Sequence, residues 1–219
     1  YIEIKKNKLM TPVLDKKKGL DFKNALDHLS EEDEILKKVI KQIKPKEPDR
    51  REPNFEALVR IISGQQLSSA AASTIFSRLK LLFKNKEITP SQIKKTKSEI
   101  ILKCGLSKAK TRYIQNLAEF FLEKPEFLNE LKAKDSDQLI ESLKKIKGIG
   151  IWSASIFALF YLNHPDVFAW GDVTIKKAIR LLYEQENIDD QKIKKIIHKW
   201  KPYRSTACLV LWRWVDEGA

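Results

Sequence analysis

The sequence contains few of the residues that build metal clusters and disulfide frameworks. Only two of its 219 residues are cysteine and only three are histidine. Cys104 and Cys208 stand alone, with no CxxC pair and no Cys/His ligand spacing around them. Because zinc and iron–sulfur sites need such ligand sets, we expect no iron–sulfur cluster, no zinc site and no other cofactor. Two isolated cysteines suit a reducing compartment, although their number alone leaves a disulfide open.

Long apolar runs and hairpin signals are also missing. No apolar run reaches 18 residues without a charge, and residues 1–8 lack the apolar core of a signal peptide. We therefore expect no membrane partner and an intracellular protein, in the cytoplasm of a prokaryote or the nucleus of a eukaryote. No β-hairpin dipeptide and no sustained alternation of apolar and polar residues occurs, which argues against a sheet. The fold class that we expect is all-α, with about nine or ten helices.

The chain carries a large positive charge. It has 42 Lys and Arg residues against 29 Asp and Glu residues, a net charge of +13 at pH 7. This excess favours a polyanionic partner, because each neutralised phosphate releases condensed counterions. A lysine-rich solvated surface is the alternative, since net charge carries no information about fold. The 42% hydrophobic content is that of a globular protein, and the length allows one domain or two small lobes.

Helical periodicity and capping residues recur along the chain. Ser30 precedes four acidic residues and an apolar stripe at helical spacing, which predicts a helix start there and an end at Lys44-Pro45. Thr89 to Gln92 forms a capping box with proline at the first helical position. Further candidate N-cap residues are Asn54, Ser68, Ser98, Ser107 and Asp135.

The most informative motif joins two predicted helices through two glycines. Gly148 and Gly150 flank Ile149, and an apolar helix follows at once. Glycine permits the positive φ of a sharp turn, and the free N–H groups at the start of the next helix can bind a phosphate. Lys145 and Lys147 lie beside this turn, and we expect Ile149 to point inward and pin the two helices together. A plain joint between two helices is the alternative.

A second motif places a carboxylate at the start of a helix. Asp172 follows Trp170-Gly171 and precedes an amphipathic segment, residues 173–183. An aspartate in this position is a preferred N-cap, which by itself is a sufficient explanation. The helix dipole at such a place also favours an ionised carboxylate.

These motifs together resemble the helix-hairpin-helix DNA glycosylases. The resemblance rests on the hairpin, on residues 167–172, on Ile61 to Ser68 and on Trp200 to Ser205, and it covers about 54–215. The most similar branch is the alkylation-repair group of the 3-methyladenine DNA glycosylase II type. The endonuclease III branch carries a four-cysteine loop, whereas this C-terminal region has only Cys208.

The resemblance implies a two-lobed helical glycosylase fold. Residues 1–53 would supply N-terminal helices that pack with the C-terminal lobe, residues 163–219. Residues 54–162 would form the central lobe and end in the helix-hairpin-helix motif, at about 137–162. The cleft between the lobes would hold Asp172, with DNA across its mouth. A monovalent cation at the hairpin, 147–150, stays an open question.

The resemblance also assigns roles to residues. Asp172 would be the catalytic carboxylate, which stabilises the cationic sugar as the base departs. Trp152, Trp170 and Trp212 would line the base pocket, with an ordinary core role as the alternative. The segment Gln65-Gln66-Leu67 would be the wedge that fills the gap left by the extruded base, with Gln66 at its tip and Leu67 as the second choice. A tight polar connection between helices is the alternative for this segment.

Two further positions refine the implied chemistry. Relatives with lyase activity place a Schiff-base lysine two residues after the second hairpin glycine, where this chain has Trp152. Without that amine the imine route to strand cleavage is closed. Arg204 would either touch a DNA phosphate or brace the loop of Asp172 from inside.

The function implied is that of a monofunctional DNA glycosylase that hydrolyses the N-glycosidic bond of alkylated purines such as 3-methyladenine and 7-methylguanine. The expected partner is double-stranded DNA that contains a damaged base, bound by a monomer. One alternative keeps the chemistry but changes the lesion to uracil, a mismatched base or a deaminated base. Another is a non-catalytic module that binds damaged DNA.

Overall fold

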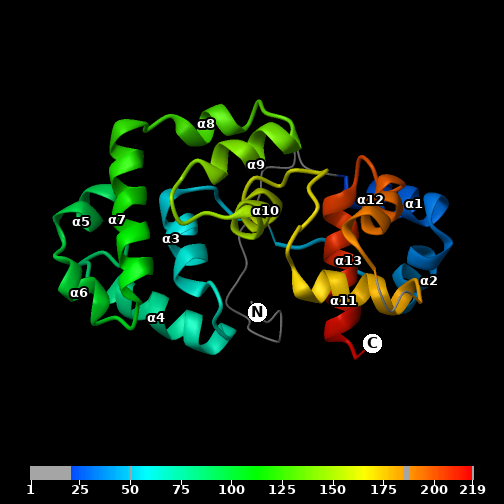
Figure 1. The fold of residues 1–219 in the computed structure, drawn as a ribbon, viewed down its shortest axis with the longest axis horizontal. Coiled ribbons are helices and arrows are strands. Elements are labelled where there is room, and N and C mark those ends of the chain that lie inside the picture. The colour runs from blue at the N-terminus through cyan, green and yellow to red at the C-terminus, as the bar shows by residue number, and fades with distance from the viewer. Residues whose placement is uncertain (1–20, 50, 185–187, 219) are drawn as a thin grey trace. The chain divides into compact units, whose positions relative to one another are not determined.

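The computed structural model of the chain describes residues 21–49, 51–184 and 188–218. In these residues it contains thirteen helices and no strand, and ten of the helices have seven residues or more (Figure 1). The expected all-α class is therefore confirmed. The helices are α1 Phe22–Glu32, α2 Glu34–Ile43, α3 Phe55–Gly64, α4 Ser69–Leu81, α5 Pro90–Lys95, α6 Ser98–Leu102, α7 Lys108–Glu123, α8 Phe127–Leu131, α9 Ser136–Lys144, α10 Ile151–Phe160, α11 Val173–Leu182, α12 Asp190–His198 and α13 Arg204–Asp216.

The described residues form two compact units, which divide after Phe157, within α10. The first unit, residues 52–157, is organised around the long helix α7, which packs on α3, α5 and α6. Edge-to-face aromatic contacts join α7 to α3 and α8, for example between Phe121 and Phe55 and between Phe120 and Phe127. Burial of apolar side chains of this kind contributes about 1.5–3 kcal/mol each. The core includes the fully buried residues Leu58, Ile62, Leu79, Ile93, Ile101, Ile114, Leu117 and Leu131.

The second unit comprises the described parts of residues 21–51 and 158–218, with α13 packed on α1, α2 and α11. A buried carboxylate near the start of this unit is bonded to two residues from its C-terminal part. Asp33, only 3% exposed, accepts hydrogen bonds from the Tyr183 hydroxyl at 2.6 Å and from the Trp200 indole at 3.0 Å. Its other oxygen caps α2. Because every oxygen of this buried group has a donor, the network specifies how α2 packs in this unit.

Most predicted helix starts are confirmed. Asn54, Ser68, Ser107 and Asp135 each accept a hydrogen bond from the first turn of their helix. The capping box begun by Thr89 forms as predicted, with both of its reciprocal bonds.

One predicted helix start is wrong, and another is right although the expected cap does not form. Ser30 lies inside α1 and its hydroxyl donates to the Leu26 carbonyl, while Asp33 is the N-cap of α2. Asp33 accepts two amide bonds on one oxygen, and its other oxygen has buried donors in Tyr183 and Trp200. Ser98 is the first residue of α6 and follows the N-cap Lys97; its hydroxyl donates to Gln115 on α7 instead.

The helix after the two glycines, α10, is apolar along nearly its whole length, and residues 153–159 are buried. The burial of these residues agrees with the apolar composition of the helix. Within the described residues, no helix combines the length and the apolar character needed to cross a membrane.

Candidate active site and nucleic-acid interface

The glycine turn between α9 and α10 has the geometry that the sequence predicted. Gly148 has φ +99°, and a Cβ placed there would lie 2.4 Å from Cγ of Tyr113 on α7. Gly150 has open space around the corresponding position, and its carbonyl accepts the first helical bond of α10, from Ala154. Ile149 is buried, whereas Lys147, Gly150 and Ile151 are exposed. Ile149 therefore anchors the turn to the interior, while the exposed backbone of the turn faces solvent.

The charges around this turn favour an anion. Lys145 and Lys147, which directly precede the turn, are both exposed. The helix α10 begins directly after Gly150, and the amides at a helix start can bind an anion. The turn can thus hold a phosphate through backbone N–H groups and through the positive end of the α10 dipole.

The segment predicted as a wedge forms a tight turn after α3. Gln66 is exposed and has φ +57°, a backbone conformation that is uncommon for a residue with a side chain. Gln65 is half-buried, and its amide nitrogen donates to the Gly148 carbonyl at 2.9 Å and to the Ser153 hydroxyl at 2.8 Å. Leu67 is half-buried. The structure thus presents Gln66 outward and favours a supporting role for Gln65, a contact that sequence reasoning missed.

In the second unit, Asp172 is the N-cap of α11. Its Oδ1 accepts a hydrogen bond from the Ile175 amide at 2.9 Å and a second from the Trp212 indole N–H at 3.1 Å. The side chain is half-buried and lies at the N-terminus of α11, which is the positive end of the helix dipole. Both bonds fall on one oxygen, so they fix the orientation of the carboxylate. The bond from Trp212 spans 40 positions and could not be predicted from local sequence.

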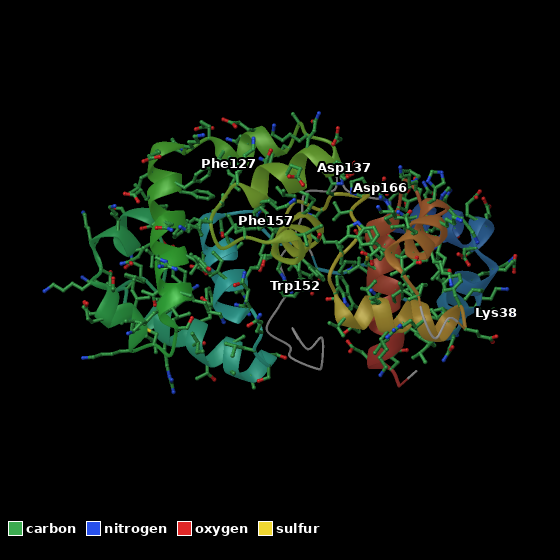
Figure 2. The ribbon with its side chains drawn as sticks, in the orientation of Figure 1. Lys38, Phe127, Asp137, Trp152, Phe157 and Asp166 are labelled. Carbon is green, nitrogen blue, oxygen red and sulfur yellow. The ribbon has the colours of Figure 1, made fainter. Side chains whose placement is uncertain are left out.

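The predicted pocket tryptophans differ in their settings. Trp212 is 7% exposed and stacks on Phe160, with ring centroids 5.6 Å apart. Trp170 is half-buried and packs edge-on against Phe168. Trp152 is the second residue of α10, half-buried, and belongs to the first unit; Figure 2 shows it on α10 with Phe157. Of the three, the structure brings Trp212 into contact with Asp172, and the pocket roles stay predictions.

Arg204 is held by an internal carboxylate. Its Nε donates to Asp166 Oδ1 at 2.6 Å and its Nη2 donates to Asp166 Oδ2 at 2.9 Å. The next residue, Ser205, donates its hydroxyl to the His164 carbonyl at 2.6 Å and accepts from the Val167 amide. The start of α13 therefore clamps the loop that leads to Asp172, which favours the bracing alternative for Arg204. Asp166, labelled in Figure 2, gave no signal in the sequence because its partner lies 38 positions away.

The two cysteines lie in the interior of the protein. Both are buried and free, which answers the open disulfide question. Burial raises the pKa of the Cys208 thiol to about 12, so it stays protonated and unreactive at neutral pH. Across the residues that the structure describes, no three His, Cys, Asp or Glu side chains gather as metal ligands.

In the described residues, the helical fold, the glycine turn at a helix start and the capping carboxylate beside an indole fit a helix-hairpin-helix protein of the DNA repair type. Residues 59–202 match the HhH-GPD superfamily of base excision DNA repair proteins, and the chain belongs to this superfamily. The predicted resemblance is confirmed.

Relatives of known name support the same branch. The chain is 33% identical to DNA-3-methyladenine glycosylase 1 of Schizosaccharomyces pombe, over 85% of this chain and 84% of the relative. It is 31% identical to the alkylbase DNA glycosidase-like protein mag2 of the same yeast, over 90% of this chain and 95% of the relative.

Two solved structures of DNA glycosylases resemble this chain in both sequence and fold. The S. pombe 3-methyladenine DNA glycosylase Mag1 in complex with abasic DNA superposes with a TM-score of 0.76 at 31% identity, covering 86% of this chain and 95% of that chain. A DNA-3-methyladenine glycosidase from Bacillus halodurans gives a TM-score of 0.74 at 32% identity, with 88% of each chain covered.

Proposed function

We propose that this protein is a DNA glycosylase that hydrolyses the N-glycosidic bond of alkylated purines in base excision repair. The observation that carries the proposal is the setting of Asp172, an anionic side chain fixed by an indole N–H at a helix N-terminus. Relatives at 31–33% identity over most of the chain are named as glycosylases for alkylated bases or as similar to them. The protein acts on DNA, and its net charge of +13 suits that polyanion.

The proposed mechanism begins with DNA binding and extrusion of the damaged base. Backbone amides after Gly150, with Lys145 and Lys147, bind one strand without reading its sequence. Gln66 enters the duplex and fills the gap as the damaged nucleotide rotates out. A monovalent cation at 147–150 stays part of the proposal, and backbone carbonyls of this turn would hold it.

Bond cleavage then depends on charge. A purine alkylated at N3 or N7 is cationic and is attracted to an indole face by about 1–2 kcal/mol, which suits the proposed lining by Trp152, Trp170 and Trp212. As the base leaves with the bonding electron pair, positive charge develops on the sugar. The Asp172 carboxylate stabilises that charge and orients water, which then adds to the sugar and loses a proton.

The reaction stops at the abasic site. The position two residues after Gly150 holds Trp152, whose indole cannot form an imine with the sugar. The strand should break only after heat or alkali. Borohydride should trap no covalent protein–DNA adduct, and a trapped adduct would contradict the monofunctional assignment.

A panel of duplex oligonucleotides, each with one lesion, tests the proposal. We expect release of 3-methyladenine and 7-methylguanine, whereas release of uracil or hypoxanthine alone would favour the alternative lesions. Asp172→Asn should lower the release rate by at least about 100-fold. Asparagine caps a helix as well as aspartate, so the melting temperature and DNA affinity should hold. Unchanged behaviour of Asp172→Asn, with binding but no release by the unaltered protein, would indicate a non-catalytic module.

A further inference from the structure

A lysine of the long helix α7 is directed into the protein rather than toward solvent. The Lys110 ammonium donates to the Ser63 carbonyl at 2.9 Å and to the Gln65 carbonyl at 2.6 Å. The two acceptors lie at the end of α3, where helix carbonyls have no helical partner. Lys110 is half-buried, and this desolvation lowers its pKa. A cation removed from water in this way is tied to the carbonyls that compensate it.

The same turn is connected to the glycine hairpin through Gln65. While the Gln65 carbonyl accepts from Lys110, its side-chain amide donates to the Gly148 carbonyl and to the Ser153 hydroxyl. Tyr113, one turn after Lys110 on α7, lies so close to Gly148 that no Cβ fits between them. One face of α7 therefore contacts both the turn after α3 and the hairpin, within a single unit.

We propose that Lys110 is a positioning residue for base extrusion: through Gln65 it holds the turn that carries Gln66 in register with the hairpin. The inference rests on the proposed function of these two turns. Gln66 is strained by its positive φ, and such a conformation persists only when surrounding contacts impose it. With two of its three N–H donors used inside the protein, Lys110 is poorly placed for a DNA phosphate.

Lys110→Met removes the charge and both donors but keeps the aliphatic chain. Lys94→Met is the matched control, because Lys94 pairs with Glu119 on the surface of the same unit. Single-turnover release of 7-methylguanine is measured in two duplexes, one with the lesion paired to cytosine and one with it mispaired. Extrusion from the stable pair needs the wedge most. We expect Lys110→Met to slow release about tenfold from the pair and about twofold from the mispair.

Further variants separate positioning from general destabilisation. Lys110→Arg should recover most of the rate, since a guanidinium also donates to carbonyls. Gln65→Leu should slow release to a similar extent, and the double variant Lys110→Met/Gln65→Leu should be no slower than either alone, because both act through one turn. Equal slowing from pair and mispair, additive effects, or a rate equal to that of Lys94→Met would overturn the inference.

A second measurement keeps this inference separate from the proposed function. Fluorescence of 2-aminopurine opposite an abasic site rises when a side chain disturbs its stacking, and it needs no catalysis. We expect the rise to be several-fold smaller for Lys110→Met than for the unaltered protein. If the unaltered protein releases no base yet shows this rise, the proposed reaction fails while Lys110 is still tested. If the rise is absent or identical in both proteins, the role of Lys110 is refuted.

Discussion

Replacing Trp212 by phenylalanine isolates the contribution of one hydrogen bond to catalysis. The indole N–H of Trp212 donates to Asp172 Oδ1 at 3.1 Å, while its ring stacks on Phe160. Phenylalanine keeps an aromatic ring on Phe160 but has no donor. The Ile175 amide still donates to that oxygen, but the bond from α13 is lost, so the carboxylate is held less firmly.

The size of the effect follows from the charge and the burial of the acceptor. A hydrogen bond to an ionised group contributes about 1.5–3 kcal/mol. Asp172 is half-buried, so solvent compensates part of the loss and the lower end of the range applies. About 1.5 kcal/mol corresponds to roughly a tenfold change in rate. We therefore expect Trp212→Phe to lower the single-turnover rate constant for base release about tenfold.

The assay is release of 7-methylguanine from a duplex under single-turnover conditions over a range of enzyme concentrations. Its plateau reports the chemical step and its midpoint reports binding. Trp214→Phe is the control, because residue 214 lies two positions further along α13 and so on a different side of the helix. Equal plateau rates for the two variants, or a change confined to the midpoint, would refute an orienting role for Trp212.

Three other predictions concern the turn, the core and the reaction product. Gly148→Ala should destabilise the protein by at least about 2 kcal/mol in urea unfolding, because the new methyl group would clash with Tyr113 and φ is +99°. Gly150→Ala should leave the midpoint of urea unfolding unchanged and weaken DNA binding only, because a Cβ there has open space. Above pH 9 the Cys208 thiol of the unfolded chain ionises, whereas the folded one, with its pKa of about 12, keeps its proton, so the free energy of unfolding should fall from pH 9 to 12. The fall should be less steep in Cys208→Ala. Equal slopes of the free energy of unfolding against pH in the two proteins would refute this. Trp152→Lys tests whether an amine at this position is enough to permit borohydride trapping of a protein–DNA adduct. Base release that depends on Asp172 should stay measurable. If no adduct forms, lyase activity requires more than this amine.

Local chemistry made much of the fold predictable. Helix starts at Asn54, Thr89 and Asp135 follow from capping, which involves residues two or three positions apart. The misassigned start at Ser30 shows the limit of such reasoning. Ser30 and Asp33 are both good caps, and the choice depends on the buried partners of Asp33, which are residues far along the chain that follow α11 and α12.

The candidate site was predictable as a set of motifs but not as an arrangement. Gly148, Gln66 and Asp172 each stand in a recognisable local pattern, and each occupies in the structure the turn or cap that its pattern predicted. The bonds that hold them run between segments 40 or more positions apart, from Lys110 to Gln65 and from Trp212 to Asp172. Lysine and tryptophan at these places give no local signal, because their partners are set by tertiary packing.

The two explanations that the sequence allowed for Asp172 are compatible in physical terms. Capping places one carboxylate oxygen over the first turn of α11, and the Trp212 indole donates to that same oxygen. The cap therefore fixes the side chain in the orientation that charge stabilisation would need, at the positive end of a helix dipole. Since asparagine preserves the cap and removes the charge, Asp172→Asn separates the contribution to the fold from the contribution to the reaction. A fold requirement alone predicts that asparagine is tolerated, and the proposed chemistry predicts that it is not.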